Sequence, residues 1–272
     1  MNASPQTAQR IGRFAWVMAW VGLVVGQLHA LSRFATLDGR EDLEYPLTRA
    51  WAVPADNALR PLLDWAAPDA VYLTYGKIWL PVFVAFTLCA FVVYARRRPT
   101  GVERWAWRLA LVGYVWACVG VACDYWTQWA TPNAFFDIAF MITVPGLLLT
   151  LLGSTVLGIT LLLKGFRPWP PALLLALMIP LAMGILQVTS MGSVALPVMF
   201  AFGILGRKIA SPLPEQLLPL VDQQHDGEAT VEQHGPADGD QPPALQPDLA
   251  RQHTAVELEQ QTGVHEHHEP VQ

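Results

Sequence analysis

The stretch FAWVMAWVGLVVGQLHAL, residues 14–31, decides the fold. It is apolar almost throughout, and its length falls within the roughly 17 to 25 residues that a helix needs to cross a bilayer. Similar runs follow. The last of them, 171–208, is too long for one span and breaks at the weakly polar QVTSMGS, 187–193, so we expect it to form two short helices, either as two spans or as a re-entrant hairpin. The sequence therefore predicts an all-α integral membrane protein, a bundle of about six transmembrane helices. The predicted spans are 14–31, 78–95, 105–123, 138–163, 171–187 and 193–206.

The composition supports this class and divides the chain in two. Hydrophobic residues make up 53% of the chain and charged residues only 14%, against roughly 25% charged residues in a soluble domain. Residues 1–208 hold 16 Lys and Arg against 10 Asp and Glu, a net charge of +6, whereas residues 209–272 hold one Arg against 12 acids, a net charge of −11. We therefore expect a polytopic transmembrane domain over 1–208 and a disordered acidic cytoplasmic tail over 209–272.

The short connections between the spans predict the orientation of the bundle. Lys and Arg gather in cytoplasmic loops; here they precede the first span and follow the second, fourth and sixth, while 124–137 contains none. With six spans all of these basic groups lie on one side, so we expect a multi-pass protein of the cell membrane with both termini cytoplasmic. The basic residues are Arg10, Arg13, Arg96, Arg97, Arg98, Arg104, Arg108, Lys164, Arg167, Arg207 and Lys208.

The connection 32–77 is the long outer loop of this topology. Prolines recur in it every seven or eight residues, so we expect short helical turns that the prolines break. The apolar residues between them suit either a structural cap, on the membrane surface or across the mouth of the bundle, or a lid or docking surface. The prolines are Pro46, Pro54, Pro61 and Pro68, and the apolar residues are Trp51, Leu59, Leu62, Leu63 and Trp65.

Small residues recur along three spans at the spacing that lets helix backbones approach each other. On the first span they are Ala15, Ala19, Gly22 and Gly26, and the same stepping reaches His29 and Arg33. On the third span they are Ala106, Ala110, Gly113, Ala117 and Gly120, and the stepping reaches Asp124. On the fourth span they are Gly146, Thr150, Ser154 and Gly158. The first and third spans run outward in this topology, so both stripes end at the outer leaflet.

The residues at the ends of these stripes form the candidate site. A carboxylate at a helix C-terminus faces the negative end of the helix dipole, so we expect Asp124 to pair with His29 or Arg33. Ionisable groups inside membranes are functional candidates, but these lie in a last helical turn, close to water. A structural clasp and a ligand, lipid or proton site both fit them. The outer polar cluster, with the residues expected at similar depth, is His29, Arg33, Lys77, Asp124, Asp137 and Gln187.

Catalytic and cofactor motifs are absent from the sequence. It contains no P-loop, dinucleotide-binding glycine pattern, HExxH or EF-hand, so we assign no catalytic residue and expect no cofactor and no nucleic-acid partner. The tail ends in HEHH, a weak metal-binding candidate without fixed geometry, formed by His265, His267 and His268. The cysteines fit buried packing positions rather than disulfides, and they are Cys89, Cys118 and Cys123.

These observations favour a non-enzymatic function. We expect a scaffold or accessory subunit that lies in the lipid bilayer and holds a membrane-protein partner through its outer loop or its tail. The alternative is a small transporter, or a lipid- or proton-handling protein, built on His29, Arg33 and Asp124. A membrane enzyme that uses these residues as acid and base has the least support, because no nucleophile accompanies them.

Overall fold

Helices form all the regular secondary structure in the residues that the computed structural model describes, which are 4–37, 39–128, 135–189 and 191–211. These residues belong to one compact unit, Met1–Pro214. The longer helices are α1 (Pro5–Ala35), α2 (Pro46–Leu63), α4 (Trp79–Arg97), α5 (Gly101–Val121), α6 (Phe135–Leu163) and α9 (Leu196–Ala210). The shorter ones are η1 (Arg40–Glu44), α3 (Pro68–Gly76), η2 (Ala122–Trp126), α7 (Trp169–Ala176), α8 (Met178–Leu186) and η3 (Met191–Ala195).

Local sequence signals account for several helix ends. Ser4 caps α1, because its hydroxyl accepts a hydrogen bond from the Thr7 backbone N–H at 3.2 Å. Proline stands in the first turn of α1, α2, α3, α7 and α9, where a backbone N–H has no partner inside the helix. Gly101, the first residue of α5, has a φ of +55°, a conformation that favours glycine.

Five helical segments are long and apolar enough to cross a membrane, among the residues that are described. They are Pro5–Ala35, Pro68–Arg97, Gly101–Trp126, Ile138–Leu163 and Ser193–Ala210. α7 and α8 meet the same criterion as a pair, with a bend of 61° between them. The predicted all-helical class, with several helices long and apolar enough to span a membrane, is therefore confirmed. The fifth predicted span falls on this bent pair.

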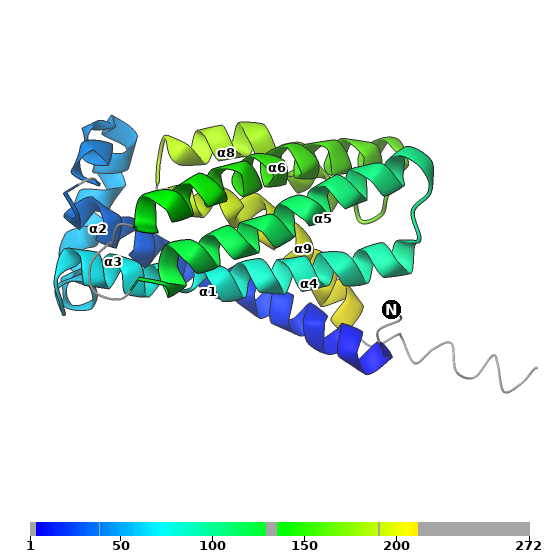
Figure 1. Ribbon diagram of the computed structural model, residues 1–272, viewed down its shortest axis with the longest axis horizontal. Coiled ribbons are helices and arrows are strands. Elements are labelled where there is room, and N and C mark those ends of the chain that lie inside the picture. Colours follow the sequence, from blue (N-terminus) through cyan, green and yellow to red (C-terminus); the bar gives the residue numbers. More distant parts are fainter. Residues whose placement is uncertain (1–3, 38, 129–134, 190, 212–272) are drawn as a thin grey trace, which may run out of the picture. The chain divides into compact units, whose positions relative to one another are not determined.

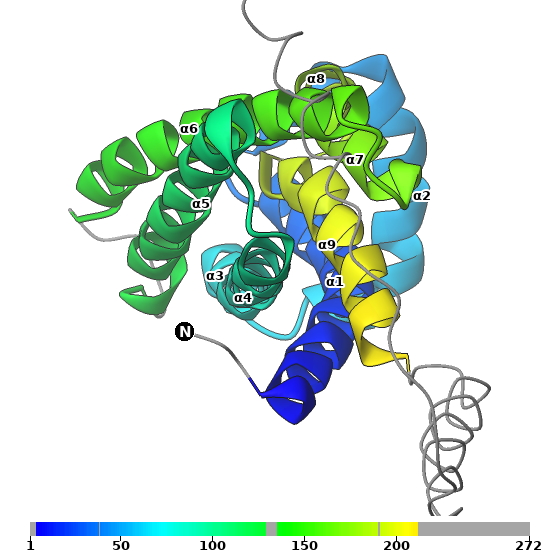
Figure 2. The ribbon, with the colours of Figure 1, turned by 90° about the vertical axis from the view of Figure 1, so that its right-hand side faces the viewer.

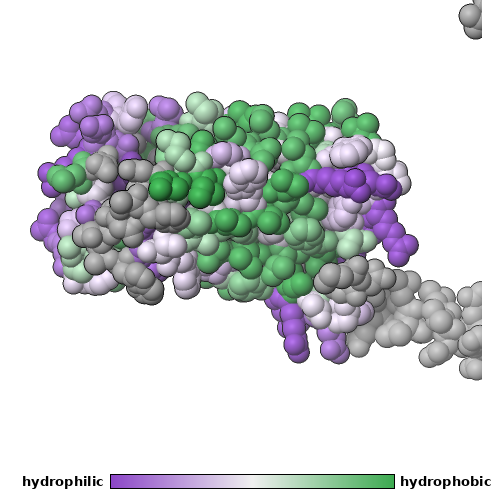
Figure 3. Space-filling model, viewed as in Figure 1, coloured by the Kyte–Doolittle hydropathy of each residue, from purple (hydrophilic) through white to green (hydrophobic). Residues whose placement is uncertain are grey.

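The helices α1, α4, α5 and α6 alternate in direction, and each lies alongside the next (Figure 1). α1 packs against α9 and α4, and α5 packs against α6, as the view along the bundle also shows (Figure 2). One end carries η1, α2 and α3, which together we call the cap. The opposite end, which we call the basic end, carries the turn between α4 and α5 and the end of α9. Hydrophobic side chains cover the middle of the visible face, and hydrophilic ones gather at its two ends (Figure 3).

Aromatic rings fill the interior of the bundle. Trp79, Phe86, Trp107, Tyr114 and Phe202 are each less than 2% exposed. The ring of Tyr114 lies edge-on to Phe86 and to Phe202, at centroid distances of 5.4 and 5.6 Å. Such pairs each contribute about 0.5–1.5 kcal/mol beyond the area that they bury. Lipid is as apolar as these side chains, so helices that lie in lipid gain nothing from removing them from water. Close packing is therefore what holds such helices together.

The small-residue stripes of α1 and α5 are packing faces, as predicted. Every residue of both stripes is buried. α1 presents its stripe to α4 and α9, so that a Cβ added at Gly22 would lie 2.9 Å from the Val82 side chain. α5 presents its stripe to α6, where a Cβ at Gly113 would lie 2.7 Å from the backbone of Leu149. The two stripes therefore pack against different helices, although they end at the same end of the bundle.

The small residues of α6 also pack against neighbouring helices. Thr150 and Ser154 are buried, and the Ser154 hydroxyl lies 2.9 Å from the Tyr114 hydroxyl on α5. A Cβ at Gly146 would lie 2.9 Å from the Trp116 ring. These contacts confirm the packing role expected for this stripe.

α2 differs from the expected series of short broken turns, because it runs as one helix through Pro54 and Pro61. Both prolines are exposed and lie seven residues apart, so they share the outward face of the helix. The carbonyl groups that lose an N–H partner there face the solvent, which can bind them instead. Proline therefore breaks the chain only at Pro46 and Pro68, which begin α2 and α3.

α2 ties the cap to the distant end of α8. The Thr48 hydroxyl donates a hydrogen bond to the Gln187 carbonyl oxygen at 3.2 Å. The indole N–H of Trp51 donates to the Val188 carbonyl oxygen. Gln187 lies 139 residues further along the chain than Thr48, so these bonds connect the cap to a segment that is distant in sequence.

A buried carboxylate fastens the basic end. The Glu103 side chain is 5% exposed and binds Arg97 Nε at 2.8 Å and Lys164 Nζ at 3.4 Å. Arg97 ends α4, Glu103 lies in the first turn of α5, and Lys164 follows α6. One acid therefore links three helices.

α9 continues to Ala210, two residues beyond the predicted end of the transmembrane domain. The rest of the predicted acidic tail, 212–272, lies outside the described residues.

Candidate functional site

His29 lies on the buried face of α1 and is only 1% exposed. The indole N–H of Trp79 donates a hydrogen bond to His29 Nδ1 at 3.1 Å. Because an indole N–H can only donate, Nδ1 carries no proton, and the neutral ring holds its proton on Nε2. Within the described part of the chain, this buried Nε2 has no hydrogen-bond partner.

The small-residue stripe of α1 makes room for this hydrogen bond. A Cβ added at Gly26 would lie 2.8 Å from the Trp79 ring, so the indole occupies the space that a larger residue would fill. His29 follows Gly26 by three residues and therefore shares its face of the helix. The small-residue stripe therefore lets α4 approach α1 and also makes room for Trp79, the hydrogen-bond partner of His29.

Three aromatic side chains surround His29, and we call them the aromatic cage: Tyr72, Trp79 and Tyr125. Tyr72 stacks on the imidazole ring, with centroids 4.6 Å apart and planes at 22°. Tyr125 meets the ring edge-on at 5.3 Å, and Trp79 does so at 6.1 Å. The Tyr72 and Tyr125 hydroxyls lie 3.3 Å apart. The cage comes from α3, α4 and η2, so it joins the cap to two spans around one side chain.

Asp124 lies in η2, a π-helical turn that ends the α5 span. Such turns are rare in proteins, and those that do occur are often found at functional sites. Asp124 is 8% exposed, and the Thr143 hydroxyl donates a hydrogen bond to its Oδ2 at 2.8 Å. Its Oδ1 is buried, and no described residue bonds to it. The carboxylate is thus only half satisfied.

Tyr125 relates the two unsatisfied groups. It follows Asp124 directly in the chain, and its ring contacts His29. Both Asp124 and Arg33 are close enough to interact electrostatically with the Tyr125 hydroxyl. His29 offers an unpaired N–H and Asp124 an unpaired oxygen, and a small molecule with both a donor and an acceptor could satisfy both.

Neither His29 nor Arg33 forms the predicted pair with Asp124: His29 Nε2 and Asp124 Oδ1 have no described partner, and Arg33 binds elsewhere. Its Nε forms an ion pair with Asp42 Oδ2 at 2.9 Å, and the guanidinium lies beside the Tyr72 hydroxyl. η1 follows α1 after a short connection and brings Asp42 back to the end of α1. A nearby carboxylate that stays half exposed can pair with Arg33 at a smaller desolvation cost than the buried Asp124.

The other members of the outer polar cluster lie on three different segments of the chain. Lys77 lies between α3 and α4, and its carbonyl oxygen accepts a hydrogen bond from Trp126 Nε1 at 3.2 Å. Gln187 is exposed and contributes its carbonyl group to the cap. Asp137 lies in the first turn of α6, and its side chain falls outside the described residues.

Metal binding has no support in the described part of the chain. No group of three or more His, Cys, Asp or Glu side chains there could hold a metal ion. The HEHH candidate, His265, His267 and His268, lies outside the described residues.

Sequence reasoning missed the aromatic cage and Thr143. Tyr72 and Trp79 lie near the predicted start of the second span, where aromatic residues are usual membrane anchors. The sequence carries no signal for Thr143 itself; in the structure a Cβ at Gly120 would lie 2.6 Å from its hydroxyl oxygen. The glycine stripe of α5 therefore marks the level at which α6 meets Asp124.

Comparison with protein-family models, with curated proteins and with solved structures finds no match.

Proposed function

We propose that this chain is a non-enzymatic scaffold or accessory subunit of the cell membrane, with six spans and both termini cytoplasmic. Six spans result if the bent pair of α7 and α8 crosses as one. The basic end then faces the cytoplasm, in keeping with the positive-inside rule, and the cap lies outside. Arg96 and Arg97 at the end of α4, and Arg207 and Lys208 at the end of α9, support this orientation.

The observation that carries the scaffold role is the apolar surface of the cap. Leu63 is buried, whereas Leu47, Leu62 and Trp65 are 63%, 47% and 53% exposed. A cap that only closed the bundle would need apolar side chains on its inner face alone. Leu62 and Trp65 lie three residues apart at and just beyond the end of α2, and Leu47 lies at its start. Exposed apolar groups at both ends of this helix support an interaction surface on the cap, and a membrane-protein partner is the occupant that fits a scaffold.

The packed interior is consistent with this role. Trp79, Phe86 and Phe202 are among the largest fully buried side chains, and Phe86 and Phe202 stack at 6.5 Å. A core filled by interlocked rings favours a fixed framework over one that must open alternately to each side.

Photo-crosslinking tests the scaffold role. A photoreactive amino acid would replace Leu62 or Trp65 in the full chain, expressed in its own membrane. The control position is Leu163, which is 83% exposed and ends α6 at the basic end. We expect one discrete protein adduct from the two cap positions and none from Leu163, and native mass spectrometry should show the same partner at fixed stoichiometry. Adducts with lipid alone at all three positions would contradict the proposal.

A second candidate function rests on the unsatisfied groups of His29 and Asp124. Ionisable side chains inside a membrane protein are costly to bury and commonly serve function. An N–H donor and a carboxylate oxygen that share the neighbour Tyr125 suit a small hydrogen-bonding ligand or a transferable proton. This observation favours a transporter, or a lipid- or proton-handling protein, over a purely structural cluster.

Native mass spectrometry with two variants separates the candidates. Asp124→Asn keeps the size of the side chain, and His29→Gln keeps a buried hydrogen-bonding group. A small molecule that the wild type retains and both variants lose would support the second candidate. A chain that keeps its protein partner in both variants, with no small molecule in any of them, would support the scaffold alone.

A further inference from the structure

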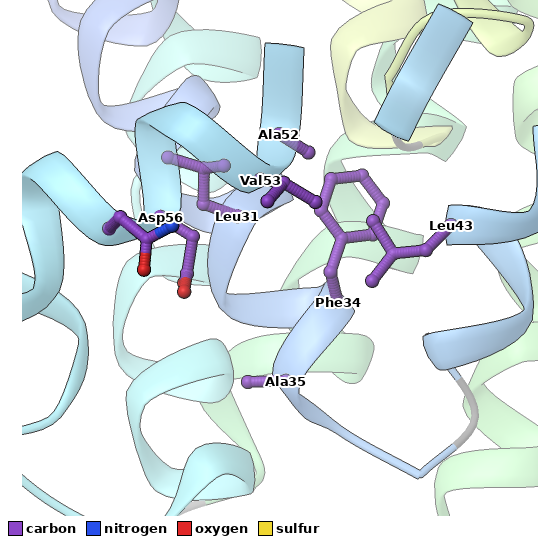
Figure 4. Close-up of a pocket in the computed structure, with 8 residues that line it drawn as sticks. Leu31, Phe34, Ala35, Leu43, Ala52, Val53 and Asp56 are labelled. Carbon is purple, nitrogen blue, oxygen red and sulfur yellow. The ribbon is translucent and has the colours of Figure 1, made fainter. Parts of the chain in front are cut away.

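A pocket of about 180 Å³ lies between the end of α1, η1 and α2. Its apolar walls are Leu31 and Phe34 from α1, Leu43 from η1 and Ala52 from α2 (Figure 4). Leu31, Phe34 and Ala52 are each less than 9% exposed, so this part of the pocket is well shielded. None of the residues that line it belongs to the outer polar cluster.

One carboxylate lines this pocket without a cation. Asp56 and Asn57, both from α2, contribute a carboxylate and an amide to the lining. Two other acids of this region are neutralised, because Asp42 pairs with Arg33 at 2.9 Å and Asp64 with Arg60 at 3.4 Å. Asp56 is half-buried and forms no ion pair with any described residue.

The end of α1 adds to the negative potential of the pocket. Ala35, the last residue of this 31-residue helix, lines it, and a helix C-terminus carries a partial negative charge that favours cations. The ring of Phe34 is a further acceptor for a cation at its face. Arg33, the cation nearest to Ala35 in sequence, is held by Asp42. Arg60, four residues after Asp56, pairs with Asp64. Carboxylate, helix end and ring thus favour a positive charge, while the remaining walls favour hydrocarbon.

We infer that this pocket binds a primary ammonium group joined to a short hydrocarbon chain. The ammonium bonds to Asp56 and Asn57, and the hydrocarbon lies against Phe34, Leu31 and Leu43. Two sources supply this chemistry at a membrane surface: the head group of an aminophospholipid and a soluble alkylamine. The inference goes beyond the scaffold role, since it needs neither a protein partner nor the His29 site.

Three probes of equal chain length isolate the charge: hexylamine, hexanol and hexanoate. Binding to the full chain in detergent would be measured by calorimetry and by the rise in melting temperature. We expect the wild type to bind hexylamine about tenfold more tightly than hexanol, as one charge-assisted bond allows, and hexanoate more weakly than either. Equal affinities for hexylamine and hexanol would overturn the inference.

Two variants and one control locate the probe. Asp56→Asn should weaken hexylamine binding about tenfold and leave hexanol unchanged, while Glu44→Gln, at an exposed acid of η1, should change neither. Val53→Trp would fill the pocket from a side chain that is already 45% exposed, so folding is preserved and both probes should be lost. Unchanged hexylamine binding in Asp56→Asn, or a tenfold loss in Glu44→Gln, would overturn the assignment.

Bilayers of two compositions distinguish the source of the ammonium group. The wild type would be placed in phosphatidylcholine nanodiscs with and without phosphatidylethanolamine. Loss of hexylamine binding in the nanodiscs that contain phosphatidylethanolamine assigns the pocket to the lipid head group, and full binding in both kinds of nanodisc assigns it to a soluble amine. Asp56→Asn should show no difference between the two bilayers.

Discussion

The indole nitrogen of Trp79 lies 3.1 Å from Nδ1 of His29 and holds the histidine as the neutral tautomer. Trp79 begins α4 and His29 lies in the last third of α1, so this bond joins the first two long spans where the chain meets the cap. Both side chains are 1% exposed. A buried polar pair of this kind is costly to break, because neither group can bind water instead.

Replacing Trp79 by Phe should therefore destabilise the protein. The variant leaves His29 Nδ1 without a donor, and an unsatisfied buried group costs about 1–3 kcal/mol. The matched control is Trp126→Phe, since Trp126 also donates through its indole but is 47% exposed. Unfolding in detergent would be followed by denaturant titration. Equal losses of unfolding free energy in the two variants would show that the burial of His29 Nδ1 adds nothing to the cost of losing its donor.

Gly26→Ala should disturb the same contact by crowding it. The added Cβ would lie 2.8 Å from the Trp79 ring, and overpacking of this kind typically costs about 1–3 kcal/mol. Gly184 in α8 is the control, because a Cβ there meets nothing within 4 Å. Gly184→Ala should stabilise the helix by up to about 1 kcal/mol. The two changes in unfolding free energy should thus have opposite signs, and a loss in both would show that helix propensity does not govern α8.

The region around His29 shows what the sequence could predict. Spacing alone identified the buried faces of α1 and α5, because small residues are what allows helix backbones to touch. It placed His29 and Asp124 at one end for the same reason. It could not identify Tyr72, Trp79 and Tyr125 as the cage, since an aromatic residue near a span end fits a lipid interface equally well.

The ion pair of Arg33 and the course of α2 depend on tertiary structure. Whether Arg33 meets Asp42 or Asp124 is decided by the way the chain turns back through η1, which no residue spacing encodes. Whether Pro54 and Pro61 break a helix is decided by the surroundings of the carbonyl groups that they leave unpaired. In α2 those groups lie on the exposed face.

Thr143→Val should destabilise the protein, because Asp124 loses its hydrogen-bond donor. It removes the hydroxyl that donates to Oδ2 at 2.8 Å and leaves both carboxylate oxygens without a described partner. We expect a loss of about 1–3 kcal/mol, and a smaller one for Thr143→Ser, which keeps the hydroxyl. The double variant Asp124→Leu with Thr143→Val should be more stable than Thr143→Val alone, because removing both partners leaves no unsatisfied group. A double variant that is less stable would mean that the carboxylate is held by something else.

Arg97→Ala should cost more than Lys164→Ala, although both cations bind the same buried Glu103. Arg97 Nε forms the shorter contact, 2.8 Å against 3.4 Å for Lys164 Nζ, and its guanidinium also lies 5.2 Å from the centre of the Phe166 ring. A hydrogen bond to a charged group contributes about 1.5–3 kcal/mol. The more exposed Lys164 should contribute at most about 1 kcal/mol.

Salt provides the control on mechanism, because high ionic strength screens exposed pairs more than buried ones. The free energy lost in Lys164→Ala should therefore shrink in 1 M salt, at a Debye length of about 3 Å, while that lost in Arg97→Ala persists. Equal losses, or equal sensitivity to salt, would show that Glu103 acts as a general negative charge rather than as a clasp on α4.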